Sequence, residues 1–184
     1  YMIPNDKKAE YLIINAVECE PYLTSDNRVL LEHSEEVLIG IEIMKKALGV
    51  KYAKVGIENN KPEAIAQMQK AAKDFEGTEI VPLKTKYPQG AEKQLVYALT
   101  KREIPSGKLP IEVGCVVNNV GTALAIYYAV QKNRPLIDNI LTYTGKDVKE
   151  NKNLLVRVGT PIRSIIDYCG GLPESTGKII SGGP

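Results

Sequence analysis

Short apolar runs alternate with longer segments of helical periodicity from about residue 10 to residue 133, and this alternation constrains the fold more than any other feature. Runs such as YLIINA and VGCVVNN have the length and composition of strands that are buried on both faces. Strands that alternate with helices require right-handed crossovers and a mainly parallel sheet. We therefore predict an α/β fold with strands at 11–16, 52–58, 79–83 and 113–119 and helices at 29–48, 61–77, 92–102 and 121–133.

The pattern changes after Arg134-Pro135. The remaining segments read strand, strand, helix and strand, and they lie at 136–145, 153–159, 161–171 and 178–183. Three β elements around one helix do not continue the alternation of the first part, and they are typical of a small α+β unit of the β-grasp kind. We predict two domains, residues 1–133 and residues 134–184.

Composition excludes several classes of function. The formal net charge is only +2 and the basic residues are scattered, so we expect no nucleic-acid partner. No apolar run approaches the length of a membrane span, so we expect no direct span. The cysteines Cys19, Cys115 and Cys169 are widely spaced without a C-x-x-C, which predicts no metal or cluster held by this chain alone. With His33 as the single histidine, no activated nucleophile is visible and we predict no catalytic residue.

The thiols have simpler expected roles. Cys115 lies inside an apolar run and should belong to the core, and Cys169 should be structural as well. Two glutamates flank Cys19, which disfavours its thiolate. We expect Cys19 to be either a buried structural thiol or a neighbour of a cofactor.

Polar residues follow three of the predicted strands, in the loops 15–21, 87–92 and 118–122. Ligands of open parallel sheets bind outside the carboxyl ends of the strands, where such loops converge. Each loop also has a simpler interpretation when it is taken alone. Asn118 and Asn119 could cap a helix, Gly90 could be a turn residue with positive φ, and the glutamates of the first loop could be solvated.

Taken together, the three loops offer a consistent chemistry. Asparagine amides suit the polar edge of a flavin or the hydroxyls of a ribityl chain, because they both donate and accept. A helix that begins after Asn119 offers free N–H groups to a phosphate. Carboxylates bind ribose hydroxyls in dinucleotide sites. The residues therefore favour a flavin or nicotinamide site over a hydrolytic one.

Four motifs carry a family resemblance: YLIINAVECEPYLTSDNRVLLEH, YPQGAEKQLVYALTKREIPSG, VVNNVGTALAIYYAV and RVGTPIRSIIDYCGG. In this order they resemble the C subunit of the Rnf electron-transport complex, which is similar to the flavoprotein subunit of respiratory complex I and to a corrin reductase. The resemblance implies a peripheral subunit on the cytoplasmic face of the cell membrane. Such a subunit takes a hydride from NADH onto FMN and passes electrons through 4Fe-4S clusters, in exchange with ferredoxin and other subunits and coupled to ion transport.

The resemblance also implies structure and site residues. Residues 10–133 would form a Rossmann-like flavin domain, and a β-grasp domain of the soluble-ligand-binding (SLBB) type would follow. Carried over by motif, the flavin contacts would come from Asn15, Glu18, Tyr87, Gly90, Glu92, Asn118, Asn119 and Thr122, with Glu20 and Glu92 nearest the nicotinamide nucleotide.

The chain departs from the family pattern at several points. Val17 stands where the complex I subunit has an aspartate, and Ala91 where it has an acidic residue. The family's glycine-rich loop is expected before residue 1 and its cluster-binding cysteines after residue 184, so we expect this segment alone to bind flavin poorly and to be inactive. Two alternatives stay open: a relative of the corrin reductase, and a non-catalytic docking module on the same fold.

Overall fold

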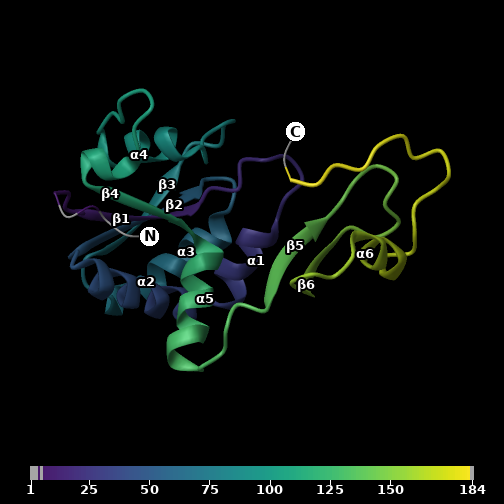
Figure 1. Ribbon diagram of the computed structural model, residues 1–184, viewed down its shortest axis with the longest axis horizontal. Helices are drawn as coiled ribbons and strands as arrows, with labels where there is room; N and C mark the ends of the chain where they lie inside the picture. Colours follow the sequence, from purple (N-terminus) through teal and green to yellow (C-terminus); the bar gives the residue numbers. More distant parts are fainter. Residues whose placement is uncertain (1–3, 5, 183–184) are drawn as a thin grey trace.

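The computed structural model describes residues 4 and 6–182, and its centre is a four-stranded parallel sheet (Figure 1). The strand order is β3-β2-β1-β4, with every neighbouring pair parallel. The bounds are β1 Tyr11–Ala16, β2 Tyr52–Glu58, β3 Thr78–Leu83 and β4 Cys115–Asn119. The predicted α/β class and the mainly parallel sheet are therefore confirmed.

Helices cover both faces of this sheet (Figure 1). Alternate residues of β1 point to opposite faces, so Leu12 and Ile14 join one core cluster while Ile13 joins the other. The first cluster lies under α1, α2, α3 and α5, and the second lies under α4. The bounds are α1 Ser25–Glu32, α2 Ser34–Leu48, α3 Pro62–Ala71, α4 Glu92–Thr100 and α5 Val120–Gln131, with 3-10 turns at Ala72–Asp74 and Pro110–Val113.

One predicted helix is two helices in the structure. The periodicity predicts a continuous helix over 29–48, but α1 ends and α2 begins around His33, which has φ −133° and ψ 33°. Ser34 and the acidic residues Glu35 and Glu36 then form the first turn of α2, where the helix dipole favours negative charge. At its other end α1 packs beside β5, where the Thr24 N–H donates to Thr142.

A small antiparallel hairpin with one helix follows α5 (Figure 1). It consists of β5 Asp138–Tyr143, β6 Lys152–Arg157 and α6 Ile162–Tyr168. The predicted last strand is not formed over 178–182, and the end of that prediction, residue 183, lies outside the described residues. A strand needs a ladder partner, and Ile179 and Ile180 are instead 58% and 59% exposed. The domain boundary near residue 134 stays a prediction.

The described helices are also informative about membranes. No helix within residues 4 and 6–182 combines the length and apolar character needed to cross one.

Cys115 and Cys169 are buried, as their structural interpretation predicts.

Candidate functional site

The turn after β1 is fastened to the loop before α4 by Asn15. Its side-chain Nδ2 donates to the carbonyl of Gly90 at 2.9 Å, and its Oδ1 accepts from the backbone N–H of Val17 at 3.1 Å. Two residues that lie 75 positions apart in the chain are thereby held together. The Asn15 amide shapes the turn, and its oxygen and nitrogen already have partners within the protein.

Gly90 is required by a close approach and not by an unusual backbone angle. A Cβ at this position would lie 2.5 Å from the carbonyl oxygen of Val17 and 3.2 Å from Sγ of Cys19. Gly90 is not among the glycines with positive φ, so its interpretation as a left-handed turn residue is wrong. Only a residue without a side chain lets the two turns meet. The half-buried Cys19 packs at this contact.

The end of β4 joins the same edge of the sheet through Asn119. Its Oδ1 accepts from the N–H of Gly121 at 2.7 Å, so the predicted helix cap is confirmed. Its Nδ2 donates to Oδ2 of Asp26 at 2.9 Å and lies 3.4 Å from the carbonyl of Asn15, its partner in the β1–β4 register. The turns after β1 and β4 and the loop before α4 therefore meet, and we call residues 15–20, 86–92 and 118–122 the carboxyl-edge site.

Glu18 is a buried structural acceptor and not a solvated loop carboxylate. Its side chain is 4% exposed. Oε1 accepts from Oγ of Ser25 at 3.2 Å and from the N–H of Asp26 at 3.0 Å, while Oε2 lies 3.4 Å from the N–H of Asn27. The Nζ of Lys61 lies 3.8 Å from Oε2. Glu18 thus satisfies N–H groups in the first turn of α1, where negative charge is favoured.

Asp26, which the sequence analysis did not single out, is the most perturbed carboxyl at this edge. Burial raises its pKa from 3.8 to about 6, the hydrogen bond from Asn119 lowers it, and the negative charge of Glu18 raises it further. Its place in the first turn of a helix gave a weak signal, since acidic residues are common there without any ligand.

Glu58 is a second residue that the sequence analysis missed. It ends β2 and is only 2% exposed. Burial raises the pKa of its carboxyl, against the backbone N–H of Lys86 and the charge of Lys61, while Glu18 raises it. Its position at the carboxyl end of a parallel strand was the one available signal.

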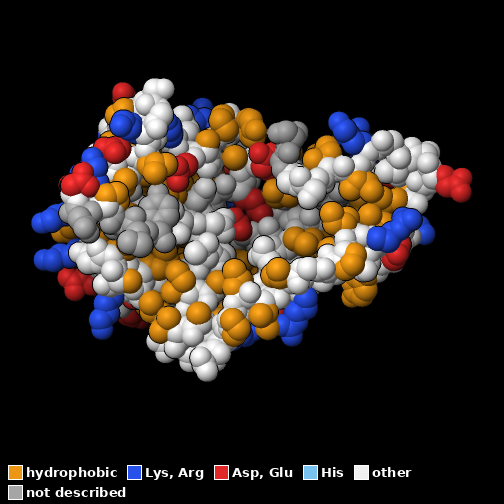
Figure 2. Space-filling view, viewed as in Figure 1, with side chains coloured by type: hydrophobic (Ala, Val, Ile, Leu, Met, Phe, Trp, Pro, Cys, Tyr) orange, Lys and Arg blue, Asp and Glu red, His pale blue; other side chains and the backbone are white. Residues whose placement is uncertain are grey.

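Three buried acceptors at this edge have no hydrogen-bond partner among the described residues: Oε2 of Glu20, Oε1 of Glu58 and Oε1 of Gln89. A buried acceptor left unpaired is costly, by about 1–3 kcal/mol. A bound molecule that brings hydroxyl or N–H donors would remove that cost, so this set of acceptors fits a flavin nucleotide. Figure 2 shows acidic side chains gathered in the hollow between α1 and the hairpin lobe, which is the unit formed by β5, β6 and α6.

The other predicted site residues lie in the same turns with fewer contacts. Asn118 is half-buried at the end of β4, and Thr122 is exposed in the first turn of α5. Glu92 is exposed at the start of α4, and Tyr87 is 61% exposed in the loop that precedes it. None of these four side chains forms a hydrogen bond with another described residue.

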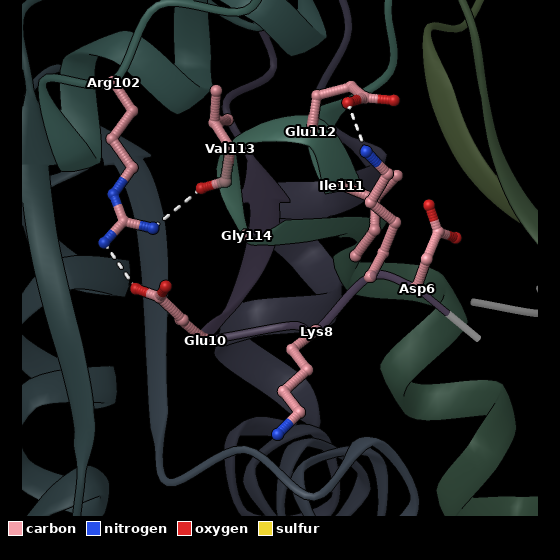
Figure 3. Close-up of a pocket in the computed structure, with 9 residues that line it drawn as sticks. Asp6, Lys8, Glu10, Arg102, Ile111, Glu112, Val113 and Gly114 are labelled. Atoms are coloured by element: carbon pink, nitrogen blue, oxygen red, sulfur yellow. Dashed lines mark hydrogen bonds and ion pairs between the residues drawn. The ribbon is translucent and has the colours of Figure 1, made fainter. Parts of the chain in front are cut away.

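A shallow cavity of about 590 Å³ lies at the opposite, amino edge of the sheet (Figure 3). Four of its charged side chains pair with one another, while Asp6 and Lys8 form no ion pair with another described residue. Nζ of Lys7 lies 2.7 Å from Glu112, and Arg102 contacts Glu10 at 2.5 Å and the carbonyl of Val113 at 2.7 Å.

Comparisons with known proteins agree with this architecture. The chain is 55% identical over 98% of its length to the C subunit of the proton-translocating ferredoxin:NAD(+) oxidoreductase complex of Clostridium ljungdahlii, covering 39% of that protein. It is 45% identical over 99% of its length to the Na(+)-translocating counterpart of Acetobacterium woodii, covering 41%. The chain therefore spans about two fifths of the length of these relatives. They confirm the resemblance that the four motifs indicated.

A solved structure supports the fold. A chain of an NAD+-reducing [NiFe]-hydrogenase in the H2-reduced state superposes with a TM-score of 0.73 at 21% identity, covering 91% of this chain and 34% of that one. The family model of the Nuo51 FMN-binding domain matches residues 2–128, which is more than half of the sequence. The chain therefore belongs to the Nuo51 FMN-binding domain family.

Proposed function

We propose that this chain is the flavin-binding part of a peripheral subunit that passes electrons between NADH and iron–sulfur clusters, within a membrane complex that exchanges electrons with ferredoxin and transports ions. The single observation that carries the proposal is the meeting of three strand-end turns, two of which carry a buried acceptor without a partner, on Glu20 and Gln89. The names of the similar C subunits favour this function over a corrin reductase or a docking module. Location at the cytoplasmic face, with 4Fe-4S clusters outside this segment, belongs to the same proposal.

Bound FMN would supply the ability to accept two electrons as a hydride and to release them one at a time. The residues of the chain divide into two groups around it. Asn15, Asn119 and Gly90 shape the site, since the amides are engaged within the protein and the glycine permits the close contact. We therefore propose that these three residues contact the flavin through the backbone that they hold in place, and not through their side chains.

The second group recognises the ligand through unpaired polar atoms. The Asn118 amide can donate and accept, while the orphaned oxygens of Glu20 and Gln89 can accept from N–H and hydroxyl groups. Glu92 in the first turn of α4, together with Glu20, would accept from hydroxyls of the nicotinamide nucleotide. Thr122 and those N–H groups in the first turn of α5 that Asn119 does not cap would lie toward a phosphate. Tyr87, being exposed, would cover the ring from the loop side.

Titration of FMN into the chain, followed by flavin fluorescence, tests the proposal. We expect Asn118→Ala and Glu20→Gln each to weaken binding about tenfold, as loss of one buried polar contact does. Arg102→Lys, at the amino-edge cavity, is the matched control and should bind like the wild type. Equal affinity in all four proteins would remove the site assignment. The nicotinamide role is tested separately in the full-length subunit that the proposal implies, where Glu92→Gln should slow NADH oxidation while the protein retains its flavin.

A further inference from the structure

Helix α1 begins without a cap of its own. Its N-cap residue, Thr24, makes no side-chain bond to the helix. Instead, Oγ1 of Thr142 accepts from the backbone N–H groups of Thr24 and Ser25, each at 3.1 Å. These partners lie 118 and 117 positions apart in the chain. Thr142 of the β5–β6 hairpin therefore caps α1, a helix that packs on the main sheet and lies far away in the sequence.

Asn153 fixes the direction of this cap. It stands directly opposite Thr142 in the β5–β6 ladder, and its Oδ1 accepts from the Thr142 hydroxyl at 2.8 Å. Because the hydroxyl proton points to Asn153, the lone pairs of Oγ1 face the helix N–H groups. Nδ2 of Asn153 also donates to Oγ1 of Thr24 at 3.0 Å. We call Thr142 and Asn153 the hairpin clamp.

The next two N–H groups of the same turn are satisfied from the other side, because those of Asp26 and Asn27 donate to the carboxylate of Glu18. The first turn of α1 is thus held jointly by the hairpin clamp and by the turn after β1, next to the hairpin lobe (Figure 1). This turn carries Asp26, whose carboxylate holds the Asn119 side chain at the end of β4. A continuous set of contacts therefore runs from the hairpin to the carboxyl-edge site.

We propose that Thr142 and Asn153 are positioning residues for the carboxyl-edge site, which act by holding the first turn of α1 so that Glu18 and Asp26 stay in place. The clamp itself is independent of any ligand, while its effect on flavin rests on the proposed function. Helices of eight residues are marginal by themselves, so external capping decides whether this first turn is ordered. The hairpin would then be part of the binding architecture and not merely an appended unit.

Hydrogen exchange of the chain without ligand tests the clamp. Thr142→Val keeps the β-branched shape and removes the hydroxyl, and we expect exchange at the amides of residues 24–27 to rise about tenfold. Thr142→Ser keeps the hydroxyl and should restore slow exchange. Thr160→Val removes a hydroxyl that bonds to none of the described residues and is the control. Faster exchange confined to residues 24 and 25 would show a local cap only and would overturn the positioning role.

A spectroscopic signal reports on the site directly. The side-chain amide of Asn119 donates to Asp26, so its NMR signal should follow the protonation of Asp26 with a midpoint near pH 6. Thr142→Val should move that midpoint toward the ordinary aspartate value, because a frayed turn exposes the carboxyl to solvent. An unchanged midpoint contradicts the inference. Should Thr142→Val fail to fold, Asn153→Ala provides the same comparison with the Thr142 hydroxyl retained.

FMN affinity separates the two proposals. If the wild type binds FMN, Thr142→Val should weaken binding about tenfold, and Thr142→Ser should restore it. Binding by the wild type that Thr142→Val leaves unchanged would overturn the positioning role and leave the flavin proposal standing. Absence of binding by the wild type would overturn the flavin proposal, while hydrogen exchange and the Asn119 signal would still decide whether the clamp orders the turn.

Discussion

Replacing Asp26 with asparagine probes the electrostatics at the carboxyl edge without any ligand. Burial raises the pKa of this carboxyl from 3.8 to about 6. Because the folded chain then holds the proton more tightly than the unfolded chain, the contribution to stability is complete below about pH 4 and is lost as the pH rises through 6. Above that pH, the folded protein carries a buried negative charge beside Glu18.

The size of the effect follows from the pKa difference. About two pKa units correspond to about 3 kcal/mol in the free energy of unfolding, as an upper value. Asparagine has nearly the same shape, keeps an oxygen that can accept from Asn119, and carries no charge at any pH. We expect Asp26→Asn to exceed the wild type in stability by up to about 3 kcal/mol at pH 7.5, with the advantage shrinking toward pH 4.5.

Urea unfolding of both proteins between pH 4.5 and 7.5 measures this difference. Asp74→Asn, which removes an exposed aspartate from the 3-10 turn after α3, controls for the general loss of one negative charge. The reasoning would be refuted by a difference between Asp26→Asn and the wild type that stays constant across this range. It would equally be refuted by an advantage that grows as the pH falls, since that result requires a lowered pKa.

Three further changes test separate parts of the structure. Gly90→Ala places a Cβ 2.5 Å from the carbonyl of Val17, so thermal unfolding should show a loss of about 1–3 kcal/mol, and an unchanged Tm would contradict the close approach. Glu58→Gln should stabilise the chain more at pH 8 than at pH 5, because the pKa of Glu58 is raised in the folded state. A Tm difference of the opposite sign would show that the ionised Glu58 carboxylate stabilises the folded chain. Gly40→Ala places a Cβ 2.0 Å from the carbonyl of Ala123, where α2 packs on α5, so urea unfolding should show a loss of at least about 1–3 kcal/mol, and full stability would mean that the helices can separate without penalty.

The sheet could be predicted because its signals are local. The run at Leu12–Ile14 is buried on both faces and reads as such from composition alone. The break at His33 could not, because helical periodicity continues on both sides of it. The strand expected at 178–183 failed for a related reason, since Ile179 and Ile180 suit a strand locally but a ladder partner is a tertiary property.

The same distinction explains the site. The pattern of parallel strands predicted which turns would meet, and Asn15, Gly90 and Asn119 do meet. The pattern did not show that the side-chain amides of Asn15 and Asn119 would form hydrogen bonds with other residues of the chain, because those bonds depend on side-chain geometry. The roles of Asp26 and Thr142 arise from partners 93 and 118 positions away, which no local periodicity encodes.

We propose that three strand-end turns form one flavin site at the carboxyl edge. NMR mapping of backbone amides during titration with millimolar FMN tests it most directly, because such concentrations detect weak binding as well. We expect shifts that saturate together in residues 15–20, 86–92 and 118–122, and none in the cavity around Arg102 and Gly114. Shifts centred on that cavity, or an unperturbed spectrum throughout the titration, would contradict it.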